Sequence, residues 1–121
     1  MSLLRHSDIP ELSQDVFDAI VDPTRRTILE LLASKGQMSA TEIYDNFDMS
    51  NPAVSQHLRI LRKADLVRIE RDAQKHLYSL KTKTMHQLEK WIKQTAEHWD
   101  QRFARLDSLL EAEKKNSKRR R

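Results

Sequence analysis

A helical alternation of apolar and polar positions dominates the stretch from Ser39 to Leu66. Ser39 and Glu42 have the spacing of a capping box, in which each side chain bonds the other residue's backbone N–H, so a helix should begin here. Ile43 and Phe47 follow four residues apart and therefore lie on one apolar face. The pattern predicts a short amphipathic helix followed by a tight turn.

A second helix should begin directly after that turn. Ser50 can cap it, and Pro52 lies in its first turn, where a missing N–H costs nothing. Its inward face is apolar, with Val54, Leu58 and Leu61 at helical spacing. Its outward face carries groups that can bond base edges or phosphates, on Asn51, Ser55, Gln56, Arg59, Arg62 and Lys63. Such a helix, held by a short partner helix, is a helix-turn-helix. The alternative is an ordinary solvated face, and we predict that the bases are contacted by Asn51, Ser55, Gln56 and Arg59.

Two further helices are predicted ahead of this motif. The first is short, and its apolar side chains are Leu12, Val16, Ala19 and Ile20. The second opens at Asp22 and Pro23, a cap and a first-turn proline, and stops near Lys35. Gly36 is the only glycine in the chain, and its place just past a helix fits a left-handed terminator. Residues 1–11 are expected to form a flexible N-terminus.

Two short strands are predicted after the motif, because apolar and polar residues alternate over 66–72 and again over 76–81. Residues 72–75 would form the hairpin between them. A β-hairpin that follows a recognition helix makes a winged helix-turn-helix. The predicted fold class is therefore mainly α with a small β-hairpin (α+β), a winged helix-turn-helix over residues 12–83 followed by a long C-terminal dimerisation helix.

That last helix should run from about Thr84 to Glu113, a stretch with neither glycine nor proline, and measure roughly 45 Å at 1.5 Å per residue. Its apolar stripe is too long for a small domain to cover alone, so we expect it to pack partly on the first helix and partly on a second copy. The predicted dimer interface consists of Val16, Met85, Leu88, Ile92, Trp99, Phe103, Leu106 and Leu110. Residues 114–121 are predicted to form a disordered basic tail.

The net charge of +4 is unevenly distributed. Residues 51–83 carry eight Lys and Arg against three Asp and Glu, whereas residues 1–50 carry four against nine. Residues 114–121 add six basic residues and no acidic one. Positive charge gathered on one helix and the segment after it is typical of a localised nucleic-acid face. The terminal basic run could add phosphate contacts or could be an idle solvated end.

Composition excludes several other classes of function. Cysteine is absent, which rules out disulfides and thiolate chemistry, and a single glycine cannot build a phosphate-cradling loop. No Ser/His/acid arrangement stands out, so we predict no enzyme activity, no catalytic residue and no cofactor. No apolar run approaches the roughly 18 residues that span a bilayer, and no export leader is recognisable. We expect a cytoplasmic protein without a membrane partner.

A second set of residues is predicted to contact the DNA backbone or to form the wing, namely Thr41, His57, Arg62, Lys63, Arg71, Gln74, Lys75 and His76. His57 lies beside Val54 and Leu58 in the sequence pattern, so a packed histidine is an equal alternative. Arg25 and Arg26 follow a helix start, where an internal ion pair with an acidic neighbour is favoured over DNA contact.

Polar and aromatic residues of the long helix suggest two further hypotheses. His86 and Glu89 share a helix face, but solvated side chains are favoured there, and we predict no metal site. Trp91, Trp99 and Phe103 could line an effector pocket between protomers, although their helical spacing favours a dimer core.

Four short motifs occur in a characteristic order: DPTRRTILELL at 22–32, SNPAVSQHL at 50–58, LRKADLV at 61–67 and YSL at 78–80. Together they resemble the ArsR family of bacterial winged-helix repressors, over about residues 12–82. The long last helix with Trp91, Trp99, Phe103 and Leu106 resembles a non-metal-sensing branch of that family. The metal-sensing branch carries a Cys-x-Cys box where this chain reads ATEIYD at 40–45, without thiols. The usual wing glycine is also missing, because the turn reads DAQK at 72–75.

The resemblance implies a homodimer, built through the first and last helices, that binds an operator and represses its own or neighbouring genes. We therefore predict a dimeric DNA-binding regulator whose partners are a double-stranded DNA operator, a second copy and a small-molecule or protein effector that the sequence leaves open. Its recognition helices would enter major grooves at half-sites about 34 Å apart. The alternative is a winged-helix module that binds protein, which would not need a charge of +5 concentrated on residues 51–83.

Overall fold

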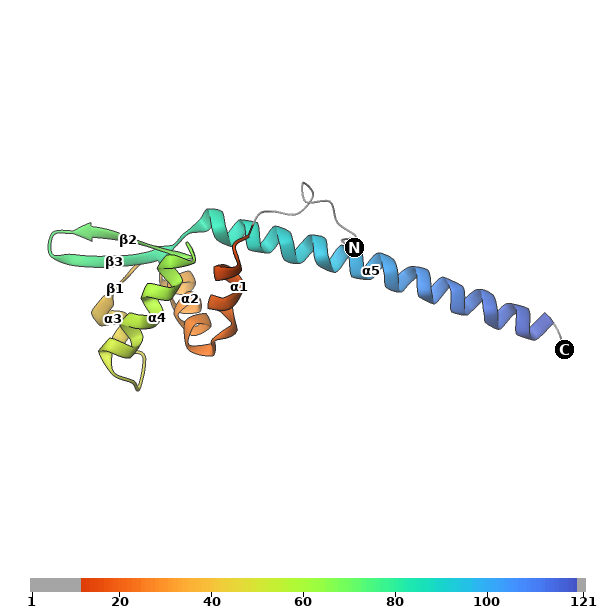
Figure 1. The fold of residues 1–121 in the computed structure, drawn as a ribbon, viewed down its shortest axis with the longest axis horizontal. Helices are drawn as coiled ribbons and strands as arrows, with labels where there is room; N and C mark the ends of the chain where they lie inside the picture. The colour runs from red at the N-terminus through yellow and green to blue at the C-terminus, as the bar shows by residue number, and fades with distance from the viewer. Residues whose placement is uncertain (1–11, 120–121) are drawn as a thin grey trace. The chain divides into compact units, whose positions relative to one another are not determined.

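The computed structural model describes residues 12–119, with side chains described through residue 115 (Figure 1). In chain order its elements are α1 (Gln14–Val21), α2 (Pro23–Lys35), β1 (Met38–Ser39), α3 (Ala40–Tyr44), α4 (Asn51–Lys63), β2 (Val67–Asp72), β3 (Lys75–Leu80) and α5 (Thr82–Arg119). The chain divides into two units, and within the described residues one runs from 12 to 88 and the other from 89 onward. Helices combined with a small antiparallel sheet confirm the predicted fold class.

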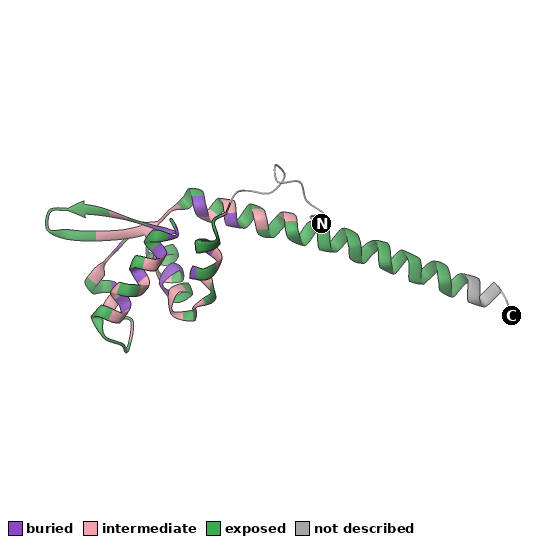
Figure 2. Ribbon diagram, in the orientation of Figure 1, coloured by how far each residue is buried: buried purple, intermediate pink, exposed green. Residues whose placement is uncertain are grey.

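The first unit has one hydrophobic core, to which α1, α2, α3, α4, the sheet and the start of α5 all contribute (Figure 2). Its buried apolar side chains are Val16, Ala19, Ile28, Leu29, Leu32, Met38, Ile43, Val54, Leu58, Leu61, Ala64, Leu66, Val67 and Leu88. Full burial of one such large side chain stabilises the fold by about 1.5–3 kcal/mol. Three of them belong to α4, so the position of this helix is set by the core.

The helix ends follow the predicted sequence signals. The side chain of Asp22 caps α2, and Gly36 ends α2 with φ at +83°, in the left-handed region. Both bonds of the capping box are present, since Ser39 N–H donates to Glu42 Oε1 and Glu42 N–H donates to Ser39 Oγ, each at 3.2 Å. Ser50 Oγ caps α4 by accepting a backbone N–H at 3.3 Å. These caps fix where α3 and α4 begin.

The wing is the predicted hairpin of β2 and β3, in which Val67 pairs with Leu80 at one end and Asp72 pairs with Lys75 at the other. Its two-residue loop places Ala73 at φ +59°, a conformation that costs a residue with a Cβ about 1–2 kcal/mol. Two-residue hairpin loops require such positive φ values, which is why glycine usually occupies them. The missing glycine therefore leaves the hairpin intact but strained.

A third strand, β1, was not among the predicted elements. It is two residues long and lies beside β3, with Met38 opposite Tyr78 and Ser39 opposite Leu77, so the sheet order is β1-β3-β2. A strand of two residues is too short to show an alternation in the sequence. It ties the start of α3 to the wing.

The turn after α4 is held by Asp65, which adopts φ +63°. Its Oδ1 accepts from Lys81 Nζ at 2.9 Å, and its Oδ2 accepts from the buried Thr84 Oγ1 at 3.3 Å. The hydrogen bond from Lys81 is the main reason that the pKa of Asp65 is lowered. One side chain thus connects the end of α4 with the start of α5.

The last helix differs from the prediction at both ends, since it begins at Thr82 and continues to Arg119. Residues 114–119, predicted to be disordered, are helical because nothing in that stretch breaks a helix and basic residues suit a helix C-terminus. Residues 1–11 and 120–121 lie outside the described residues. No helix of the described chain is both long enough and apolar enough to cross a membrane.

The predicted dimer interface also divides into two sets. Val16 and Leu88 are buried in the core of the first unit, and Met85 is partly buried against that core, because α1 and the first turns of α5 pack on the same domain. These three side chains therefore leave little surface for a second chain. The other five, Ile92, Trp99, Phe103, Leu106 and Leu110, are exposed.

Candidate nucleic-acid interface

Helix α4 turns one face to the core and the other outward. Val54, Leu58 and Leu61 are at most 2% exposed, so rotation of the helix about its axis is fixed. The outward face has five exposed residues, Asn51, Gln56, Arg59, Arg62 and Lys63. Ser55 lies on the same face and is partly buried. The structure therefore brings all four predicted base-facing residues to the outer surface of one helix.

Two of these side chains are joined to each other. Arg59 Nη1 donates to Gln56 Oε1 at 3.1 Å, across one turn of the exposed face. The bond restricts both long side chains before any ligand arrives. It leaves the guanidinium with further N–H donors, and Arg presents these in a planar fork that matches the two acceptors of guanine.

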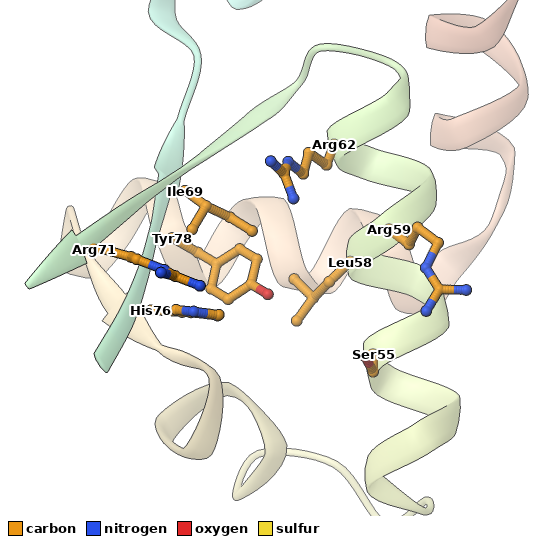
Figure 3. A pocket seen from close by; sticks show the side chains of 8 residues that line it. All are labelled: Ser55, Leu58, Arg59, Arg62, Ile69, Arg71, His76 and Tyr78. Carbon is orange, nitrogen blue, oxygen red and sulfur yellow. The ribbon is translucent and has the colours of Figure 1, made fainter. Parts of the chain in front are cut away.

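A groove of about 400 Å³ separates α4 from the wing (Figure 3). It is lined from α4 by Ser55, Leu58, Arg59 and Arg62, and from the wing by Ile69, Arg71, His76 and Tyr78. Figure 3 shows Arg62 reaching from α4 toward the strands and Arg71 reaching from β2 into the same space. The groove thus combines apolar side chains with cationic groups from both sides.

The charge of this groove is not compensated by described carboxylates. Within residues 12–115, the ion pairs of basic side chains in the wing region join Arg68 to Glu70 at 2.6 Å and Lys81 to Asp65 at 2.9 Å. No described carboxylate forms an ion pair with Arg62 or Arg71. A ligand that carries negative charge, such as a phosphate, suits these two guanidinium groups.

Tyr78 is a groove residue that was not among the predicted site residues. Burial raises the pKa of its phenol, so its O–H remains a donor at neutral pH. The alternation of β3 places it on the same side as His76, two residues earlier, and this period of two could have revealed it. Tyr78 adds a neutral donor between the arginines.

The predicted wing residues occupy two positions. Arg71 and His76 lie opposite each other in the hairpin and both line the groove. Gln74 lies in the loop and Lys75 next to it, and both are exposed at the tip. The wing therefore presents basic groups both along the groove and at its end.

For His57 the sequence left contact with the DNA backbone and a packed position as equal alternatives. At about 100° per residue it lies on the flank of α4 away from Arg59 and Arg62. Its Nδ1 is 3.3 Å from Arg25 Nη1 and 3.8 Å from Asp22 Oδ2, so the ring faces the start of α2. The packed alternative describes its position.

Arg25 and Arg26 bond within the protein, as predicted, but to carbonyl oxygens rather than to the side chain of an acidic neighbour. Arg25 donates to the carbonyls of Asp18 and Ala19, at 3.0 and 2.7 Å. Arg26 Nη1 donates to the carbonyls of Ile20 and Val21, at 2.7 and 2.8 Å. Both arginines thus satisfy the last carbonyls of α1, which have no partner within the helix.

Thr41 is exposed in the first turn of α3. The neighbouring Glu42 carboxylate already accepts the Ser39 N–H, and hydrogen bonds from Ser39 lower the pKa of Glu42. The hydroxyl of Thr41 is therefore an exposed donor beside the backbone N–H groups of this helix start. Among the described residues, no group of three His, Asp or Glu side chains is arranged to hold a metal ion.

Three comparisons with known proteins match this picture. The model of the family described as "Bacterial regulatory protein, arsR family" matches residues 22–68. The transcriptional repressor SdpR of Bacillus subtilis is 42% identical over 78 residues, which cover 64% of this chain and 86% of SdpR. An uncharacterized HTH-type transcriptional regulator of Methanocaldococcus jannaschii is 38% identical over 68 residues, covering 56% of this chain and 76% of that protein.

Solved structures show the same fold. The ArsR-like transcriptional regulator from Rhodococcus sp. RHA1 superposes with a TM-score of 0.70 at 24% identity, covering 81% of this chain and 89% of that one. The fold and the exposed recognition helix define a winged-helix, DNA-binding transcriptional regulator. The chain belongs to the ArsR family of bacterial regulatory proteins.

Proposed function

We propose that the protein is a homodimeric, sequence-specific repressor that binds an operator near its own or neighbouring genes. In each protomer α4 enters a major groove, and the wing follows the adjacent backbone or minor groove. Gln56 and Arg59 read base edges together with Asn51 and Ser55. Two recognition helices related by a twofold axis contact half-sites about one helical turn apart.

The observation that carries this proposal is the groove between α4 and the wing. Arg62 approaches it from the recognition helix and Arg71 from the wing, and Tyr78 adds an O–H donor between them. A sugar-phosphate strand that passes between a major-groove helix and a wing would lie in this groove. Its phosphates would accept hydrogen bonds from the guanidinium groups of Arg62 and Arg71, while Arg59 and Gln56 face the bases in the major groove.

Relatives support the repressor role. SdpR is named a transcriptional repressor, and two staphylococcal proteins that match at 34% identity are named arsenical resistance operon repressors. These names describe those proteins. For this chain the absence of cysteine means that any effector acts without thiolate ligands.

The test is a fluorescence-anisotropy titration with duplexes from the region upstream of the protein's own gene. The proposal expects a preference over random duplex of at least about 10³ at physiological salt. Equal affinity for both duplexes, with a correctly folded protein, would contradict sequence-specific binding. A protein-binding module would show that second result.

The roles of the two groups of side chains can be separated in the same assay. Arg59→Ala should reduce the preference for the operator over random duplex, because a bidentate base contact contributes discrimination of about 1–3 kcal/mol. Lys75→Ala should weaken binding to both duplexes alike, because a phosphate contact carries no sequence information. Unchanged binding by both variants would show that DNA occupies another face.

A further inference from the structure

A second cavity, of about 500 Å³, lies on the face of the wing that is turned away from α4, and Arg68 and Ser79 belong to its lining. Successive residues of a strand point to opposite faces of a sheet, so Arg68 and Ile69 face opposite ways. Figure 3 shows Ile69 and Tyr78 on the side of α4. This second cavity, here called the outer cavity, is therefore separate from the groove between α4 and the wing.

The walls of the outer cavity are of two kinds. One wall is apolar and consists of Leu32, Ala33 and Leu80. The other carries three cationic side chains, which are Arg68, Lys81 and Lys83. Among the described residues that line the cavity, none is acidic. Its volume falls within the range of about 300–1,000 Å³ that is usual for small-molecule sites.

The guanidinium of Arg68 is held in place by two contacts. Its Nε donates to Ser79 Oγ at 3.2 Å across the strand pair, and its Nη2 lies 2.6 Å from Glu70 Oε1. A guanidinium has five N–H donors, so these contacts leave others for a ligand. The planar fork of an arginine matches the oxygens of a carboxylate or a phosphate. Arg68 is thus oriented beside the cavity before any ligand arrives.

Two lysines line the same cavity from the segment that follows β3. Lys81 Nζ bonds Asp65 Oδ1 at 2.9 Å, whereas Lys83 forms no ion pair with a described carboxylate. The hydrogen bond from Lys81 and, to a smaller extent, the charge of Lys83 lower the pKa of Asp65, so both ammonium groups act on the same small region. With Arg68 paired to Glu70 and Lys81 paired to Asp65, the charge of Lys83 remains uncompensated.

We propose that the outer cavity binds a small organic anion, a molecule that carries a phosphate or carboxylate group on an apolar body. The anionic group would bond Arg68 and Lys83, and the apolar body would lie against Leu32 and Leu80. An inorganic anion would leave the apolar wall unused, and a neutral ligand would leave the cations unpaired. The two walls together therefore define the class of ligand.

Occupancy of the outer cavity should also weaken DNA binding, and this step rests on the proposed function. Arg68 pairs with Ser79 in the hairpin, and the next pair, Ile69 with Tyr78, faces the DNA groove. The two sites therefore share the same two strands. A bound anion adds negative charge behind the wing and competes with Glu70 for Arg68. Coupling of this kind typically changes an affinity by about 5-fold or more.

Backbone amide signals of the full chain without DNA test the site by itself. Phenyl phosphate, benzoate and neutral benzyl alcohol are titrated at constant ionic strength. We expect saturable shifts of Gly36, Ser79 and Lys83 with at least one anion, at a dissociation constant of about 1 mM or lower, and none with benzyl alcohol. The tighter anion identifies the charged group. Equal affinity for benzyl alcohol would overturn the class of ligand, and no saturable shift with either anion would overturn the site.

Matched variants distinguish the outer cavity from the DNA groove. The double variant Arg68→Gln, Lys83→Gln should raise the dissociation constant of the tighter anion by about 10-fold or more, because charge-assisted hydrogen bonds are lost. Arg71→Gln removes an arginine of the same strand from the opposite face and should leave these shifts unchanged. All three positions are exposed, so both variants should fold. Loss of the shifts in Arg71→Gln alone would place the anion in the DNA groove and overturn the proposal.

Fluorescence anisotropy with the operator measures the coupling. At a saturating concentration of the tighter anion, the parent protein should bind DNA about 5-fold more weakly, and the double variant should not respond. Equal weakening in the double variant would indicate competition in the DNA groove, and an unchanged affinity of the parent protein would also overturn the coupling. The amide titration contains no DNA, so a failure of the outer cavity is distinct from a failure of operator binding.

Discussion

Replacement of Arg62 by alanine tests the groove between α4 and the wing most sharply. Arg62 is exposed, lines the groove, and forms no ion pair with a described carboxylate. Its removal should leave the fold unchanged, since surface substitutions shift the free energy of unfolding by roughly ±0.5 kcal/mol or less. DNA binding should weaken because one phosphate contact per protomer is lost.

The size of that effect follows from counterion release. Each lost phosphate contact lowers the slope of log K against log salt by about 0.9, so two protomers lower it by about 1.8. If the parent protein and Arg62→Ala bind equally at 1 M salt, this difference in slope makes the variant about 30-fold weaker at 0.15 M salt, or about 2 kcal/mol. The loss should be equal for operator and random duplex, because phosphates carry no base information.

The matched control is Arg68→Ala. Arg68 is also an exposed arginine of this unit, but its guanidinium pairs with Glu70 at 2.6 Å and bonds Ser79 at 3.2 Å. Its removal should change the salt slope much less than the removal of Arg62. Anisotropy titrations at four or five salt concentrations measure both slopes. Equal slopes for the parent protein and Arg62→Ala, or an equal decrease in both variants, would refute the role of the groove.

Three further predictions concern the groove hydroxyl and the fold that supports the site. Tyr78→Phe should weaken DNA binding by about 1.5–3 kcal/mol in anisotropy if its O–H donates to a phosphate, and unchanged affinity would exclude that bond. Gly36→Ala should lower the free energy of unfolding by about 1 kcal/mol in urea titrations, because φ is +83° while no atom lies within 4 Å of an added Cβ; an unchanged value would mean that α2 ends differently. The hydrogen bond from Lys81 lowers the pKa of Asp65. The ionised carboxylate therefore stabilises the folded state above pH 3.8, its ordinary pKa, and this stabilisation is lost as the pH falls below 3.8. Asp65→Asn, which tolerates φ +63°, should therefore be less stable than the parent protein at neutral pH and approach it in acid, and a constant difference across pH in thermal melts would contradict this.

The sequence was most informative where local chemistry decides the structure. Asp22, Gly36, Ser39 and Ser50 each act through a backbone group within a few residues, so their caps could be predicted from spacing alone. The exposed side of α4 was predictable for a similar reason, because one apolar stripe fixes the opposite face. Contact of that face with DNA stays a prediction.

The sequence was less informative where distant segments meet. β1 exists only because Met38 lies opposite Tyr78, forty residues away in the chain. His57 faces Asp22 and Arg25, which a pattern along α4 cannot show. Likewise Val16 and Leu88 share the apolar character of a dimer seam, and only the packed domain shows that its own core covers them.

Protection of guanine N7 against methylation would test the entry of α4 into a major groove most directly. With DNA from the region upstream of the protein's own gene, we predict two clusters of protected guanines about 10–10.5 base pairs apart. Arg59→Ala should remove protection of individual guanines while the protein still binds. A bound complex with no guanine protected in the major groove, or with a pattern unchanged by Arg59→Ala, would contradict the proposed recognition.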